Sequence, residues 1–316
     1  MGRSSASSYA PIVPPSLLIW PQPPYLPGMA FRLSSAIPFR KTKPLVSVVR
    51  LNGVIAASSR MRAGLNLTSV APLLERAFAP KDQKAVALIV NSPGGSPVQS
   101  HLITQRVRQL ADEKNIPVVV FAEDVAASGG YMLACAGDEI FCDQSSVLGS
   151  IGVISAGFGF KGLIEKIGVE RRVHTAGESK SMLDPFKDEV PEDIDRLRTL
   201  QGEIHDHFKS LVRERRAGKL KAPEEELFTG AFWTGSEAVK LGLADGIDDV
   251  RSVMRRRYGD TVKLRVVAPP KSLSLFGSRI SSDGSVPASF WPHTEGWAEE
   301  ALGAIEQRTL WGRFGL

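Results

Sequence analysis

Ser128 stands in the segment Asp124-Val-Ala-Ala-Ser-Gly-Gly-Tyr131, between the apolar run Val118–Ala122 and an apolar stretch that begins at Tyr131. This pattern predicts a serine at a strand-to-helix turn. Small neighbours let a substrate backbone approach the hydroxyl, and the helix that follows directs its positive N-terminal dipole at developing negative charge. Such a turn suits acyl transfer, although a serine that only caps the helix fits the same residues.

A second glycine turn lies upstream, where the strand-like run Ala85–Val90 enters Asn91-Ser-Pro-Gly-Gly-Ser-Pro97 and a helical pattern follows. Backbone N–H groups freed at this turn could form an anion nest, and the N–H of Gly95 paired with that of Gly129 would form an oxyanion hole. An ordinary strand-to-helix turn is the alternative. The segment is too short for a Walker A loop and lacks its Lys, which argues against phosphate binding at this turn.

A serine nucleophile needs a base, and no histidine stands in a convincing relay with it. The chain has five: His101, His174, His205, His207 and His293. A lysine can replace histidine when burial lowers its pKa. Lys180 follows the strand-like run Val169–Val173 and precedes a loop that contains Pro185. The residues alone leave open whether Lys180 is this base or a solvated lysine.

The chain carries five ordered motifs across roughly Pro44–Val267: Asn91-Ser-Pro-Gly-Gly, Ala127-Ser-Gly-Gly-Tyr131, Gly149-Ser-Ile-Gly-Val153, His174-Thr-Ala-Gly177 with Lys180, and Trp233-Thr-Gly235 followed by Leu241-Gly-Leu-Ala-Asp245. Together these motifs resemble the signal peptide peptidase A and SohB family of Ser/Lys serine peptidases. The resemblance implies that Ser128 is the nucleophile and Lys180 its general base. It also implies that Gly95 and Gly129 supply the oxyanion N–H groups and that Ser150 orients the lysine amine. A plain turn serine is the alternative for Ser150.

The elements that must position these residues alternate between strand and helix, which predicts an α/β fold with a parallel-rich sheet and covering helices. The expected strands lie near 45–51, 85–90, 118–122 and 139–142, and the expected helices near 70–78, 97–113, 128–136, 160–167, 191–216 and 236–241. Both glycine turns fall at carboxyl ends of strands, where such sheets place ligands. The resemblance implies a ClpP/crotonase-like fold whose serine and lysine meet across a subunit boundary in a homo-oligomeric ring.

Residues 1–43 are predicted to form a Pro-rich, basic, disordered arm, because residues 1–44 hold nine of the 21 prolines and no long periodic segment. Residues 44–268 are assigned to the peptidase domain, and residues 269–316 to a C-terminal tail of unknown role. Neither serine-containing glycine motif repeats along the chain. The chain therefore resembles the short form of the family.

The net charge of +5 lies entirely in residues 1–44, which carry five basic residues and no acidic one. A nucleic-acid partner would require a basic stripe in the folded part. The densest basic group there is interpreted as the solvated end of a long helix. It comprises Lys209, Arg213, Arg215 and Arg216, interrupted by Glu214. We therefore expect no nucleic-acid partner.

The N-terminal arm leaves the localisation open between cytoplasmic and peripherally membrane-associated. Its most apolar piece, Leu17–Trp20, is too short for a transmembrane helix and poor as a signal-peptide core. If the chain starts at Met29, residues 30–43 form a short basic lead that could contact an anionic membrane surface. A solvated tail is the alternative.

Cys135 and Cys142 are predicted to be small core residues rather than a disulfide, and no Cys-x-x-Cys pattern or histidine cluster lies nearby to suggest a metal site. The expected function is a serine endopeptidase that hydrolyses small or unfolded polypeptides, such as signal-peptide remnants, with no metal or organic cofactor. A crotonase-like acyl-CoA enzyme and a non-catalytic ring scaffold stay open as alternatives. A ClpP-like Ser/His/Asp site is disfavoured because no histidine occurs between Ser128 and His174.

Overall fold

The computed structural model describes residues 43–57, 64–268 and 308–315, all within the second of two compact units, Lys43–Leu316. The predicted N-terminal arm and most of the predicted tail therefore lie outside the described residues, and so does Met29. The elements are β1 (Leu45–Asn52), α1 (Leu67–Phe78), β2 (Gln83–Ser92), α2 (Pro97–Lys114), β3 (Val118–Ala127), α3 (Gly129–Ala134), β4 (Glu139–Cys142), β5 (Val147–Gly149), α4 (Lys161–Lys166), the 3₁₀ turn η1 (Glu178–Ser181), α5 (Pro191–Arg215), α6 (Glu224–Leu227), β6 (Phe232–Thr234), α7 (Gly235–Leu241), β7 (Gly246–Ile247), α8 (Val250–Tyr258) and β8 (Lys263–Val266).

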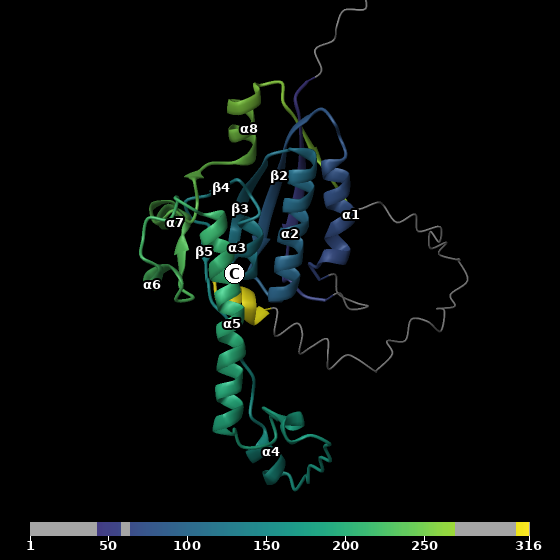
Figure 1. Cartoon of the computed structure of the whole chain (residues 1–316), viewed down its shortest axis with the longest axis vertical. Coiled ribbons are helices and arrows are strands. Elements are labelled where there is room, and N and C mark those ends of the chain that lie inside the picture. The colour runs from purple at the N-terminus through teal and green to yellow at the C-terminus, as the bar shows by residue number, and fades with distance from the viewer. Residues whose placement is uncertain (1–42, 58–63, 269–307, 316) are drawn as a thin grey trace, which may run out of the picture. The chain divides into compact units, whose positions relative to one another are not determined.

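The strands form one sheet in the order β6-β5-β3-β2-β1-β8, and β4 pairs with both β3 and β7. Every pairing is parallel except that of β5 with β6. Helices α1, α2 and α3 pack on one side of this sheet (Figure 1), and α8 packs on the other. The predicted fold class, an α/β fold with a parallel-rich sheet and covering helices, is confirmed.

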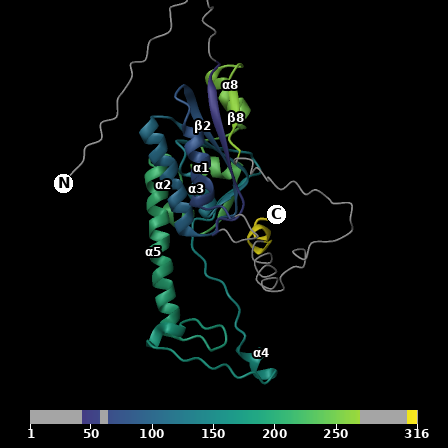
Figure 2. The same ribbon diagram turned by 90° about the vertical axis from the view of Figure 1, so that its right-hand side faces the viewer.

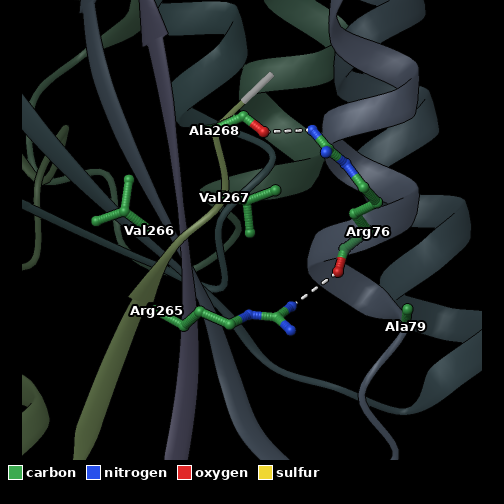
Figure 3. A pocket seen from close by; sticks show the side chains of 6 residues that line it. All are labelled: Arg76, Ala79, Arg265, Val266, Val267 and Ala268. Carbon is green, nitrogen blue, oxygen red and sulfur yellow. Dashed lines mark hydrogen bonds between the residues drawn. The ribbon is translucent and has the colours of Figure 1, made fainter. Parts of the chain in front are cut away.

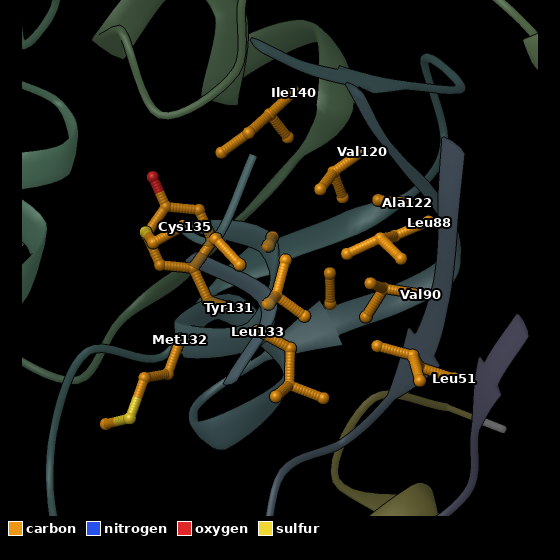
Figure 4. Close-up of a cluster of buried hydrophobic side chains, with 14 of the residues drawn as sticks. Leu51, Leu88, Val90, Val120, Ala122, Tyr131, Met132, Leu133, Cys135 and Ile140 are labelled. Atoms are coloured by element: carbon orange, nitrogen blue, oxygen red, sulfur yellow. The ribbon is translucent and has the colours of Figure 1, made fainter. Parts of the chain in front are cut away.

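The central strands are buried on both faces, as expected for parallel strands with helices on each side. In β2 the run Ala85–Val90 is entirely buried, and its side chains alternate between two clusters. Leu88 and Val90 face the larger cluster with Tyr131 of α3 (Figure 4). Ile89 faces the smaller cluster, which includes Met254 of α8. The apolar runs that predicted strands therefore form the middle of the sheet.

Two of the covering helices begin at side-chain caps that the sequence encodes locally. Asn66 and Ser69 form a capping box at the start of α1. Ser96 accepts a hydrogen bond from the Gln99 N–H at the start of α2, where Pro97 occupies the first turn. The second cap fixes where β2 ends and α2 begins, and so it fixes the glycine turn between them.

The segment between β5 and α5 departs from the prediction. The strand-like run 169–173 forms no strand, and its residues are exposed. It lies in the segment that contains α4, near the far end of α5 from the sheet (Figures 1 and 2), and has no neighbouring strand with which to pair. The prediction of a strand there was wrong. Valine residues favour an extended backbone, but a strand also needs a neighbouring strand with which to form hydrogen bonds.

The basic group at the end of α5 is solvated only in part, because Arg213 is exposed whereas Arg216 is buried. Each of its cations pairs with a carboxylate, Lys209 with one on α5 itself and the three arginines with carboxylates of other segments. The ion pairs are Lys209–Asp206, Arg213–Glu224, Arg215–Asp138 and Arg216–Asp245. Arg216 is only 1% exposed. This group therefore offers no free basic surface.

Both cysteines are free and buried, as predicted. Burial raises the pKa of the Cys135 and Cys142 thiols to about 12. Because the thiolate is the reactive form, we expect the native protein at pH 8 to resist alkylation by iodoacetamide. Mass spectrometry should find two adducts per chain after unfolding in urea and none before it. Rapid modification of the native protein would contradict the buried position of both thiols.

Candidate active site

Ser128 occupies the junction of β3 and α3 in a conformation that is uncommon for a non-glycine residue, with φ 53° and ψ −123°. Its carbonyl accepts the N–H groups of Tyr131 and Met132, and its own N–H donates to Gly149 O at 2.8 Å. The hydroxyl makes no cap hydrogen bond, and the residue is half-buried. Strained backbone of this kind costs about 1–3 kcal/mol and is held by its surroundings, which is typical of functional positions.

The glycine turn after β2 lies directly against Ser128. A Cβ atom added to Gly94 would lie 2.8 Å from Ser128 Cβ and 2.9 Å from Gly129 N. No side chain fits in that space, and Gly94 also has a φ of +103°. The structure therefore brings together the two turns that the sequence singled out. The contact itself runs through Gly94, which the sequence prediction passed over in favour of Gly95.

The N–H groups of Gly95 and Gly129 donate no hydrogen bond to any residue that the structure describes. On either side of Gly95, Gly94 O accepts from Ile55 N–H at 2.8 Å and Ser96 N–H donates to Ile55 O at 2.7 Å. Gly95 itself is exposed, and its N–H group has no acceptor among the described residues. Gly129 begins α3, where the first N–H groups of a helix have no intrahelical partner. Two unused donors thus accompany the Ser128 turn.

Ser150 lies beside the same turn. It is 5% exposed, has a φ of +51°, and follows Gly149, which accepts the Ser128 N–H. Its own N–H donates to Ala231 O at 2.6 Å, which ties it to the residue before β6. Within the described part of the chain its hydroxyl makes no hydrogen bond. The neighbouring ring of Trp233 covers Gly149, a contact that sequence reasoning missed although both residues lie in the motifs it quoted.

Lys180 is not brought to Ser128 within one chain. It lies in η1 and is exposed. Arg196 in the first part of α5 donates to Ser179 Oγ at 3.2 Å, which places η1 beside that part of the helix. Further along α5 the helix contacts the body of the domain, where the His205 ring lies 3.0 Å from Ile151 O. The rise of an α-helix puts these two points roughly 13 Å apart.

Neither a histidine relay nor a metal site is found in the described part of the chain. His205 contacts a backbone carbonyl, and His174 lies in the exposed segment before η1. No group of three or more His, Cys, Asp or Glu side chains there could hold a metal ion. No described helix has both the length and the apolar run that a membrane span requires.

The sequence from residue 111 to residue 262 matches the profile of Peptidase family S49. A relative from Synechocystis sp. whose name describes it as a protease is 31% identical over 247 residues, which cover 75% of this chain and 84% of that protein. The chain belongs to peptidase family S49. Two of the motifs on which the resemblance rests, Asn91-Ser-Pro-Gly-Gly and Ala127-Ser-Gly-Gly-Tyr131, lie against each other in the fold.

Other matches carry different names or lower similarity. A protein of Brucella abortus named "Na(+)/H(+) antiporter NhaA" is 51% identical over 297 residues, which cover 92% of this chain and 39% of that protein. The chain thus spans about two fifths of the length of this relative. Among solved structures, a 1510-N membrane-bound stomatin-specific protease with a substrate peptide has 18% identity and a TM-score of 0.47, and the match covers 73% of this chain and 94% of that one.

Proposed function

We propose that this S49 protein is a serine endopeptidase that cleaves small or unfolded polypeptides through a Ser128/Lys180 dyad. The observation that carries the proposal is the pair of unused N–H groups, Gly95 and Gly129, that accompany the strained Ser128 turn. Donors fixed in this way stabilise an oxyanion without reorganisation, and each is typically worth about 3 kcal/mol of transition-state stabilisation. Homologues named signal peptide peptidase and protease support the same activity.

The proposed mechanism uses only groups of the protein and water. The neutral Lys180 amine takes the proton of Ser128 Oγ while Oγ attacks the substrate carbonyl carbon. The carbonyl oxygen becomes an oxyanion that accepts the Gly95 and Gly129 N–H groups. Protonated Lys180 gives its proton to the leaving amine as the C–N bond breaks. Lys180 then takes a proton from water, which attacks the acyl-enzyme and releases Ser128.

The lysine of this dyad is proposed to come from a second copy of the chain. Lys180 is exposed and lies along the part of α5 that extends beyond the domain body, whereas Ser128 belongs to that body. A neighbouring subunit in a ring would present its Lys180 to the Ser128 turn. The Ser150 hydroxyl, which makes no hydrogen bond among the described residues, would then accept one from the incoming amine and hold it toward Ser128 Oγ.

The antiporter name of the Brucella relative is not part of this proposal. The match to the Brucella relative covers 39% of that protein, whereas the match to the Synechocystis protease covers 84% of that protein. The family profile also falls within the described domain, over residues 111–262. Peptide substrates, including signal-peptide remnants, are therefore the substrate class that we propose.

Labelling with a fluorophosphonate tests this function, because such probes form a covalent bond only with an activated serine. We expect the assembled wild-type protein to be labelled. We expect Ser128→Ala and Lys180→Ala each to be labelled at least about 100-fold more slowly. Ser145→Ala, which changes an exposed serine, serves as the matched control. Labelling that persists without Ser128, or none in the assembled wild type, would instead favour the acyl-CoA enzyme or the scaffold.

A further inference from the structure

A cavity separate from the Ser128 turn lies between the end of α1 and the end of β8 (Figure 3). Its volume is about 360 Å³. None of its lining residues belongs to the proposed catalytic site, and strands β1 and β2 separate β8 from β3 in the sheet. The lining residues are Arg76, Ala79, Arg265, Val266, Val267 and Ala268. The set contains two cations and no carboxylate.

Both arginines are held by neutral oxygens and not by acids. Arg76 donates to the carbonyls of Pro72 and Ala268, and Arg265 donates to Ser47 Oγ at 3.1 Å and to the Arg76 carbonyl at 2.9 Å. Figure 3 shows the two bonds that join Arg76 to Ala268 and Arg265 to Arg76. Neither forms an ion pair with any residue that the structure describes, whereas all four cations of the basic group on α5 do so. Two positive charges therefore line one cavity with no compensating charge.

Arg265 Nε gives an independent indication of a missing partner. It is the one buried side-chain nitrogen or oxygen atom in the described residues that makes no hydrogen bond. Buried donors are almost always satisfied, and leaving one without an acceptor is unfavourable. Because the neighbouring Nη2 atom already donates to Ser47 and Arg76, the guanidinium is fixed in place while its Nε–H remains unused.

We propose that this cavity binds a phosphate group through Arg76 and Arg265. Two guanidinium charges match a phosphate, which carries close to two negative charges near neutral pH, better than a carboxylate, which carries one. Guanidinium N–H groups donate charge-assisted hydrogen bonds to phosphate oxygens, and Arg265 Nε, which has no partner, is the donor that such a bond would use. Ala79 and Val267 offer an apolar wall for the carbon part of a phosphate ester.

Calorimetric titration of the full chain with inorganic phosphate at low ionic strength tests the proposal. We expect binding to the wild type and a dissociation constant that is roughly tenfold or more higher in Arg265→Gln and in Arg76→Gln. Arg255→Gln is the matched control, because Arg255 is exposed and the same charge is removed elsewhere. Wild-type protein that does not bind phosphate, or binding that Arg265→Gln leaves unchanged, would overturn the proposal.

A second variant covers the case in which an arginine substitution prevents folding. Ala79 is exposed at the end of α1, so Ala79→Asp places a carboxylate in the cavity while both arginines remain. We expect this variant to fold and to lose phosphate binding. Vesicles then distinguish the source of the phosphate. Flotation with phosphatidic acid vesicles but not with phosphatidylcholine vesicles would assign the site to a lipid headgroup, and phosphate binding without flotation would assign it to a soluble ester.

Discussion

Subunits of Ser128→Ala mixed with subunits of Lys180→Ala should recover peptidase activity that neither variant has alone. Each variant retains the group that the other lacks, and an interface with an intact Ser128 on one side and an intact Lys180 on the other forms one complete site. With equal amounts and random assembly about one quarter of the sites are complete, since interfaces between neighbouring copies in a ring are heterologous. Each variant alone should be at least about 1000-fold below the wild type.

The measurement is hydrolysis of an unfolded polypeptide after the two variants have been dissociated and reassembled together. The matched control mixes Ser128→Ala with the double variant Ser128→Ala/Lys180→Ala, which assembles in the same way but contains no nucleophile. Native mass spectrometry shows whether mixed oligomers have formed. If mixed oligomers form and activity does not return, a dyad shared between subunits is contradicted.

The parts of the site that the sequence predicts well are those encoded by short segments. A buried apolar run followed by glycines places the end of β2 within two residues, because a chain that leaves a parallel sheet must turn at that point, whereas β3 runs on to Ala127, past the predicted end at 122. Parallel neighbours end at the same edge of the sheet. The meeting of the Gly94 turn with Ser128 therefore follows from two local patterns.

The parts that the sequence does not predict depend on pairings across long separations. β5 has three residues and pairs with β6, so that Gly149 lies opposite Phe232. Neither strand has a periodic pattern long enough to recognise. The ring of Phe314, in the tail to which no role could be assigned, packs against Phe232 with centroids 5.1 Å apart. The position of Lys180 relative to Ser128 is the extreme case, because in our proposal it is set by a neighbouring subunit.

The basic group on α5 shows that the burial of a charged side chain likewise cannot be predicted from the nearby sequence. Arg216 looks like one more cation at the end of a helix, and nothing near it in the sequence indicates burial. Its partner Asp245 follows α7, 29 positions further on. Asp245 belongs to the motif Leu241-Gly-Leu-Ala-Asp245, which is among the motifs on which the resemblance to the peptidase family rests. Its observed contacts are structural, since the carboxylate accepts the Ile140 N–H at 2.7 Å and joins the end of α5 to β4.

Asp245→Ala is accordingly expected to destabilise the domain strongly without touching the catalytic turn. Arg216 Nη1 donates to Asp245 at 2.7 Å, and its side chain is 2% exposed, so the variant leaves a buried guanidinium with only Gly242 O as a partner. Removal of one member of a buried ion pair typically costs about 3–5 kcal/mol. Urea unfolding measures the loss of unfolding free energy. Asp248→Ala, which breaks the exposed Arg256–Asp248 pair, should lose no more than about 1 kcal/mol.

The pH dependence of stability separates the ion pair from the volume that alanine removes. Burial alone would raise the pKa of Asp245, but hydrogen bonds from Arg216 and the Ile140 N–H outweigh it and lower that pKa from its ordinary value. A carboxyl whose pKa is lower in the folded state stabilises the protein above its unfolded pKa, and this stabilisation is lost as the pH falls through the folded value. The difference in unfolding free energy between wild type and Asp245→Ala should therefore be constant from pH 7 to about pH 5 and shrink below about pH 4. A difference that stays constant down to pH 3 would assign the whole effect to packing.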